Sequence, residues 1–259
     1  MKLSPITRFS FAYVCITVFL FSSSVQASSN TSKLPKQDWS FSGLFGTYDR
    51  ASAKRGFQVY TEVCSGCHSM DLLSYRHLTG INFSEEEIKA IATDVEITDG
   101  PNDDGDMFER PGLPSDRFVS PYENAKAAAA SNNGKMPPDL SLMTKARIGG
   151  PDYLYALLTG YTDEPPEGIE IPEGGNYNKY YPGNIIAMAQ PLSEDAVEYP
   201  NGVKATEKQL ARDVTTFLAW AAEPEMEERK MLGVKVLIFL LVLTGMLYAV
   251  KRKIWEDQH

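Results

Sequence analysis

Two cysteines and a histidine stand close together in the first third of the chain, as Cys64-Ser65-Gly66-Cys67-His68. A C-x-x-C-H sequence is the attachment signal for a c-type haem. Each thiol bonds to one vinyl group of the porphyrin, and the two intervening residues let the backbone turn once, so that both sulfur atoms reach the same macrocycle edge. The histidine can then ligate the iron. The motif predicts one covalent haem c on Cys64 and Cys67, with His68 as an axial ligand.

Three other uses of paired cysteines compete with haem attachment. A thioredoxin-like redox pair is usually found beside a βαβ pattern, which this sequence lacks. A zinc site needs four ligands, but the other histidines are His77 and His259, and the only other cysteine is Cys15. A structural disulfide between Cys64 and Cys67 would close a very small ring. Covalent haem is therefore the favoured interpretation.

The charge of the chain limits the kinds of partner. The formal net charge is −9 at pH 7, and residues 28–230 alone carry 19 basic and 32 acidic side chains, a formal charge of −13. A nucleic-acid partner would require a basic face, so no nucleic-acid binding is expected. An acidic domain is compatible with a basic protein partner.

Residues 1–27 have the features of a secretory signal peptide. Lys2 and Arg8 form a basic start, residues 9–21 are mostly apolar, and Val25-Gln26-Ala27 supplies a small-residue cleavage site. The apolar run is short for a membrane span, although an uncleaved anchor is the alternative. Export suits the haem prediction, because bacteria attach c-type haem outside the cytoplasmic membrane.

A second apolar segment lies near the other end of the chain, at residues 232–250. Nineteen helical residues rise about 28 Å, close to the roughly 30 Å hydrocarbon thickness of a bilayer. We therefore predict a single transmembrane helix at 231–250, between an exported domain at 28–230 and a cytoplasmic tail at 251–259. This topology puts the domain on the periplasmic side of a bacterial cytoplasmic (inner) membrane.

The elements that would position the motif are helices and long loops. Ala53, Phe57, Tyr60 and Cys64 recur at helical spacing, so a helix is predicted to deliver the haem-binding sequence. Other helix starts are expected at Ser84 with Glu87, Ser120 with Glu123, Pro151, and Thr206 with Gln209. No alternating strand pattern is evident. The predicted fold class is mainly α, a cytochrome c-like haem domain with long loops and one C-terminal transmembrane helix.

Two long connections and an aromatic segment complete the domain. Residues 96–119 and 161–205 are rich in glycine and proline, and loops of this length are often functional. We expect them to wrap the haem edge and to supply its second axial ligand. Four aromatic residues before the motif are expected to cover part of the domain. They are Trp39, Phe41, Phe45 and Tyr48.

Methionine and histidine are the usual second axial ligands. The exported methionines are Met70, Met107, Met136, Met143, Met188 and Met226. A position within the second long loop favours Met188, while Met143 and His77 remain as alternatives.

The sequence resembles the cytochrome c1 family, the haem subunits of ubiquinol–cytochrome c reductases. The resemblance covers nearly all of residues 28–259, including the stretch before the apolar helix, Trp220-Ala221-Ala222-Glu223-Pro224. Its segments after the C-x-x-C-H motif are Tyr75-Arg76-His77-Leu78, Gly100-Pro101-Asn102-Asp103-Asp104-Gly105, Arg110-Pro111-Gly112, Asn132-Asn133-Gly134, Pro137-Pro138-Asp139-Leu140-Ser141 and Ala146-Arg147. Two departures are Ile148, where the family often has His, and Gln190, where it often has Pro.

The resemblance implies both a site and a function. It implies that Met188 is the sixth iron ligand, that Arg147 and Asn132 lie near the haem propionates, and that Pro138 lies by the haem. It also implies respiratory electron transport from the Rieske iron–sulfur protein to a cytochrome c, with cytochrome b as a core partner. The chain would then be no enzyme on its own. The alternative is a membrane-tethered mono-haem electron carrier of another pathway.

Overall fold

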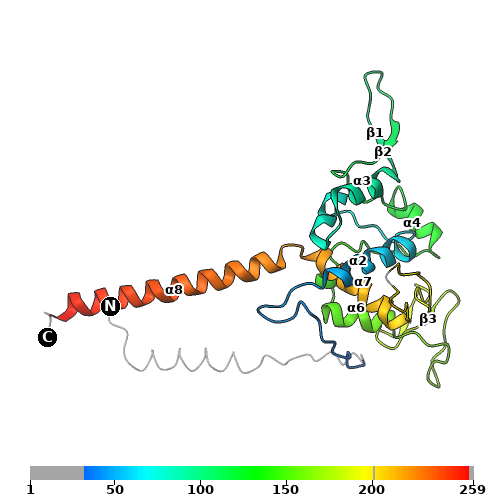
Figure 1. Ribbon diagram of the computed structural model, residues 1–259. Helices are drawn as coiled ribbons and strands as arrows, with labels where there is room; N and C mark the ends of the chain where they lie inside the picture. The colour runs from blue at the N-terminus through cyan, green and yellow to red at the C-terminus, as the bar shows by residue number, and fades with distance from the viewer. Residues whose placement is uncertain (1–31, 201, 257–259) are drawn as a thin grey trace, which may run out of the picture. The chain divides into compact units, whose positions relative to one another are not determined.

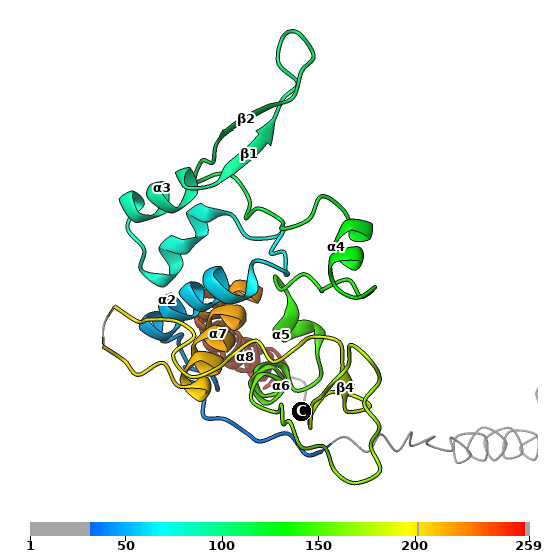
Figure 2. The same ribbon diagram turned by 90° about the vertical axis from the view of Figure 1, so that its right-hand side faces the viewer.

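The computed structural model describes residues 32–200 and 202–256, and helices dominate this part of the chain (Figures 1 and 2). The predicted signal peptide lies outside the described residues. The helices are α2 (Arg50–Val59), η1 (Tyr60–Cys64), η2 (Tyr75–Ile81), α3 (Glu85–Thr93), α4 (Ala125–Ser131), α5 (Met143–Ala146), α6 (Gly150–Leu158), α7 (Glu207–Ala222) and α8 (Met226–Trp255). The prediction of a mainly helical fold is confirmed.

The core forms where α2 crosses α7 (Figure 1). Leu210, Val214 and Phe217 on α7 are almost completely buried, as their helical spacing predicts. Gly56 on α2 allows the close approach, because a Cβ atom there would lie 2.0 Å from the carbonyl oxygen of Asp213. A side chain at position 56 would therefore force the two helices apart.

Short strands interrupt both long connections, and the sequence did not predict them. β1 (Glu96–Asp99) pairs antiparallel with β2 (Phe108–Pro111), and Figure 2 shows this hairpin beside α3. β3 (Asn176–Tyr177) pairs in the same way with β4 (Ile185–Ile186). The strands are only two to four residues long, which is too short for a recognisable alternation of polar and apolar residues.

Most of the predicted helix starts are correct, with one exception. Ser84 and Thr206 accept hydrogen bonds from the backbone three residues later, at the starts of α3 and α7. Ser120 does not begin a helix. Instead, the carboxamide of Asn124 caps α4, which starts at Ala125.

Of the residues that the structure describes, α8 alone is long and apolar enough to span a membrane. Its 30 residues correspond to about 45 Å, so the predicted span at 231–250 lies within one continuous helix. Among the described residues from Met231 to Glu256, the side chains are exposed to varying degrees and none is buried, as expected of a helix whose surroundings are lipid rather than protein.

Candidate haem site

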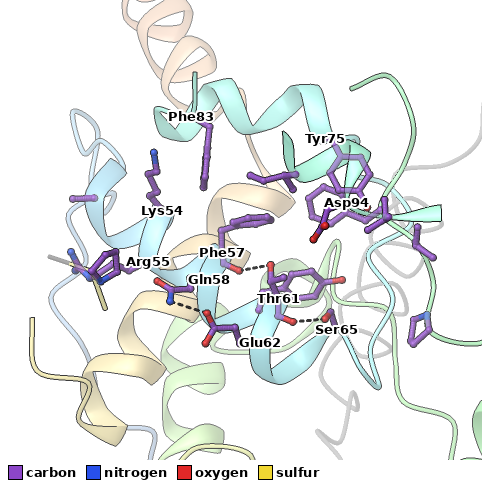
Figure 3. Close-up of a pocket in the computed structure, with 18 residues that line it drawn as sticks. Lys54, Arg55, Phe57, Gln58, Thr61, Glu62, Ser65, Tyr75, Phe83 and Asp94 are labelled. Atoms are coloured by element: carbon purple, nitrogen blue, oxygen red, sulfur yellow. Dashed lines mark hydrogen bonds between the residues drawn. The ribbon is translucent and has the colours of Figure 1, made fainter. Parts of the chain in front are cut away.

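The helix α2 continues into a π-helical turn, η1, and the last residue of η1 is Cys64, the first residue of the C-x-x-C-H motif. The Ser65 amide donates to the Tyr60 carbonyl, five residues back, at 2.8 Å. Thr61 and Ser65 each donate a side-chain hydrogen bond to a carbonyl four residues earlier, at 3.0 and 2.7 Å (Figure 3). The amides of Cys67 and His68 then both donate to the Cys64 carbonyl, at 3.1 and 2.9 Å. The motif is thus wound into one turn, as its spacing predicts.

Both thiols of the motif are free. Cys67 is exposed, whereas Cys64 is half-buried against the core, and burial raises the pKa of its thiol to about 12. A redox-active dithiol needs the opposite, a lowered thiol pKa. Within residues 32–200 and 202–256, no cluster of three or more His, Cys, Asp or Glu is suited to a metal ion. The raised pKa of the Cys64 thiol therefore weighs against the thioredoxin-like interpretation.

The imidazole of His68 is oriented by one backbone contact. Its Nδ1 lies 2.7 Å from the carbonyl oxygen of Pro138. A carbonyl can only accept, so Nδ1 carries the proton, and Nε2 keeps the lone pair that a metal needs. Burial also lowers the pKa of His68, which favours the neutral ring. These features fit an axial ligand of a haem.

Pro138 is held in place by an aspartate that the sequence analysis did not single out. The Asp139 carboxylate accepts from the Ser69 hydroxyl at 3.0 Å, from the Asp71 amide at 2.7 Å and from the Ser141 amide at 2.8 Å. It thereby ties the segment that holds Pro138 to the residues directly after His68. The only available sequence signal was the Pro-Pro-Asp-Leu-Ser segment of the resemblance.

Met188 follows β4 in the second long connection and is half-buried. Its carbonyl accepts a hydrogen bond from the Tyr161 hydroxyl at 3.1 Å. Burial and the neighbouring Tyr153 raise the pKa of Tyr161, and burial likewise raises the pKa of Tyr153, partly offset by the guanidinium of Arg147. The Tyr161 hydroxyl therefore ties the segment that carries Met188 to the chain just after α6.

A buried asparagine shapes the segment that carries Met188. Asn178 is fully buried, and its amide group donates to the Leu157 carbonyl at the end of α6, at 2.7 Å. Its side-chain oxygen accepts from the amides of Tyr180 and Tyr181, at 3.0 and 3.2 Å. These hydrogen bonds tie the segment from Asn178 to Tyr181 to the end of α6.

The two predicted propionate partners have only local contacts in the structure. Asn132 ends α4, where its side chain donates to the Ala128 carbonyl at 2.7 Å and to the Tyr122 hydroxyl at 3.0 Å. Arg147 follows α5, is exposed, and donates to the Ala146 carbonyl at 3.2 Å. An exposed guanidinium is available to bind a carboxylate.

A separate hollow of about 780 Å³ lies beside α2 (Figure 3). Aromatic side chains line it, among them Phe57, Tyr60, Tyr75 and Phe118. Among the described residues around it, neither cysteine of the motif nor His68 contributes to its wall. Ser65, between the two cysteines, does line it, so the hollow borders the motif without including the proposed haem-binding side chains.

The chain is similar in sequence to known proteins. The model described as the "Cytochrome C1 family" matches residues 39–258. The chain is 56% identical over 220 residues to "Cytochrome c1 1, heme protein, mitochondrial" of Arabidopsis thaliana, covering 85% of this chain and 71% of the relative. It is 48% identical over 255 residues to "Cytochrome c1" of Rhodospirillum rubrum, covering 93% and 94%. It is 47% identical over 264 residues to "Cytochrome b/c1" of Bradyrhizobium diazoefficiens, covering 93% and 38%.

Proposed function

The chain belongs to the cytochrome c1 family, and on that basis we propose that it transfers single electrons from a Rieske iron–sulfur protein to a cytochrome c. The observation that carries the proposal is the single turn of the C-x-x-C-H motif, with the His68 ring oriented by Pro138 at 2.7 Å. When bound, a c-type haem supplies an iron that takes up and releases one electron. No substrate bond is made or broken on this chain, so it acts as a subunit and not as an enzyme on its own.

The chain's own residues have separate tasks in this proposal. Cys64 and Cys67 would hold the porphyrin by thioether bonds, and His68 and Met188 would be the axial ligands. Arg147 and Asn132 would bind the haem propionates, since a guanidinium and a carboxamide both donate hydrogen bonds to a carboxylate. The half-buried Tyr161, whose hydroxyl bonds to the Met188 carbonyl, would help keep water from the Met188 side.

We also propose that the chain works as part of a membrane-bound protein complex. The name "Cytochrome b/c1" of the Bradyrhizobium relative supports a cytochrome b partner. The exported domain at 28–230 would lie on the periplasmic side of the bacterial cytoplasmic membrane, with a span at 231–250 and a tail at 251–259. Purification of the full chain from native membranes should also recover a b-type cytochrome and an iron–sulfur protein. Isolation without either would instead indicate a tethered carrier of another pathway.

Covalent haem attachment is the first testable prediction. Denaturing electrophoresis followed by haem staining should give colour at the mass of this chain, because thioether bonds survive denaturation. The control is the double variant Cys64→Ala with Cys67→Ala, which should lose the colour. Complete removal of colour from the unsubstituted chain by acidic extraction of free haem would contradict the prediction.

The acidic character of the domain predicts salt-dependent association with a basic acceptor. One segment between Tyr161 and β3 carries five exposed acidic side chains, Asp163, Glu164, Glu167, Glu170 and Glu173. The association rate should fall as salt rises, since the screening length shortens to about 10 Å at 0.1 M. Replacing the four glutamates by glutamine should lower the rate at low salt by roughly tenfold.

A matched control for this measurement lies on the hairpin of β1 and β2. Asp103, Asp104, Asp106 and Glu109 are also acidic and exposed, but they lie away from the segment that carries Met188. Their replacement by the corresponding amides should change the association rate much less. A rate that is independent of salt would point to an apolar docking surface and would contradict the prediction.

A further inference from the structure

One of the four aromatic residues before the motif is not part of the core. Trp39, Phe41 and Tyr48 are buried, with 6%, 9% and 5% of their surface exposed. Phe45 is 73% exposed and its neighbour Leu44 is 56% exposed. The expectation that all four cover the domain is therefore wrong for Phe45, and two large apolar side chains stand together at the tip of a loop.

This loop, residues 41–48, is fixed to the start of α8. The ammonium group of Lys230 donates to the carbonyls of Phe41 and Gly46, at 2.7 and 3.1 Å. The Glu227 carboxylate accepts from the Tyr48 amide at 2.7 Å. Residues of the first two turns of α8 therefore hold both sides of the loop, so its tip keeps a fixed position relative to that helix.

The loop tip and the first apolar residues of α8 line the same hollow. This hollow is lined by Leu44 and Phe45 of the loop and by Met231, Leu232 and Lys235 of α8. Charged residues at the start of α8 complete its wall, namely Glu225, Glu227, Glu228, Arg229 and Lys230. Met231 and Leu232 are 50% and 60% exposed. Four exposed apolar side chains thus adjoin each other where the apolar stretch of α8 begins.

We infer that the loop is a second membrane contact, in which Leu44 and Phe45 lie in the interfacial layer of a phospholipid bilayer. The tip and the start of α8 line one hollow, and α8 is long and apolar enough to span a membrane. Aromatic side chains concentrate at membrane–water interfaces. Lys235 lies about 6 Å below Met231 along the helix, a depth from which a lysine can extend to the interface.

The small size of the tip favours lipid over a protein partner. A stable protein interface buries about 800 Å² on each side, and two adjacent side chains provide only a small part of that area. An interfacial segment needs to enter the bilayer by only 5–10 Å or so. The inference concerns the membrane contact alone and does not depend on the proposed electron transfer.

Spin labelling of the full-length, haem-containing chain tests this inference. The variant Phe45→Cys would be labelled with a nitroxide and reconstituted into phosphatidylcholine–phosphatidylglycerol bilayer discs. Collision rates would be measured with oxygen, which partitions into lipid, and with a water-soluble nickel chelate. Met107→Cys in the β1–β2 hairpin, 59% exposed, is the water control, and Leu241→Cys in α8, 73% exposed, is the lipid control.

At position 45 we expect an oxygen-to-nickel ratio several-fold above that at 107 and below that at 241. A ratio equal to that at 107 would place the loop in water and overturn the inference. Protection from both reagents would show that protein covers the tip and would overturn it as well. Leu44→Cys provides an independent second reading. Labelling of the unsubstituted chain measures any background from Cys64 and Cys67.

Discussion

Replacing Met188 by leucine should leave the haem attached but change its spectrum and lower its reduction potential. The haem stays because Cys64, Cys67 and His68 are untouched. Leucine keeps the bulk of the side chain but removes the sulfur, a soft donor that favours the ferrous state. We expect a fall of at least about 100 mV, within the ~0.8 V range that axial ligands span. Potentiometric titration and carbon monoxide binding to the reduced protein measure the two effects.

Met143→Leu is the matched control for this substitution. Met143 is buried in the core with 7% of its surface exposed, so its replacement should affect stability slightly and leave the potential unchanged. Met188→Lys should attach an amine ligand and also lower the potential. If Met188→Leu left the potential and the low-spin spectrum unchanged, another residue must be the ligand. Met143 and His77 would then be tested next.

Replacing Arg55 by methionine should greatly destabilise the fold. Arg55 donates through Nε and Nη2 to the two carboxylate oxygens of Asp213, both at 2.8 Å. The side chain of Asp213 is completely buried, and it also accepts from the Ser52 hydroxyl at 2.6 Å. Without Arg55 this carboxylate would be a buried charge with no cation beside it, which typically costs about 3–5 kcal/mol. Urea unfolding of the full chain, followed by circular dichroism, measures the loss.

The adjacent residue provides a control with the same chemistry and less burial. Lys54 pairs with Glu87 at 2.7 Å, but the two side chains are 37% and 46% exposed. Lys54→Met should therefore lower the free energy of unfolding by less than about 1 kcal/mol. Equal losses for the two variants would show that burial does not determine the contribution of the Arg55 pair.

The sequence predicts an element best where the signal is local. Ser84 and Glu87 exchange hydrogen bonds with each other's backbone amide, at 3.2 and 2.8 Å, and α3 begins there as predicted. The same pair of residue types at Ser120 and Glu123 does not begin a helix. The Ser120 hydroxyl bonds to the Tyr122 carbonyl instead, and Asn124 offers a competing cap two residues before Lys126. Each N-cap side chain stabilises a helix by about 1 kcal/mol, so Ser120 and Asn124 are too similar in energy for the sequence to show which of them caps the helix.

Residues that act through distant contacts could not be identified in this way. A buried asparagine such as Asn178 has the same letter as an exposed one, and its hydrogen bond to the Leu157 carbonyl, 21 residues away, is visible only in the fold. Likewise, the motif predicted His68 as a ligand, but its proton position depends on the carbonyl of Pro138. The sequence motif was enough to identify His68 as a candidate ligand. The orientation of its ring and the position of its proton could be read only from the fold.

The separation between His68 and Pro138 bears on the order in which the site can assemble. The two cysteines and His68 lie within five consecutive residues, so an extended chain can present them to a haem before any long-range contact has formed. The contact that orients His68 closes over 70 residues, and Met188 lies 120 positions beyond His68. Each doubling of such a separation costs only about 0.6 kcal/mol in closure entropy, but the long closures slow folding. The proposed attachment of haem can thus precede folding, and the proposed ligation by Met188 would complete the site last.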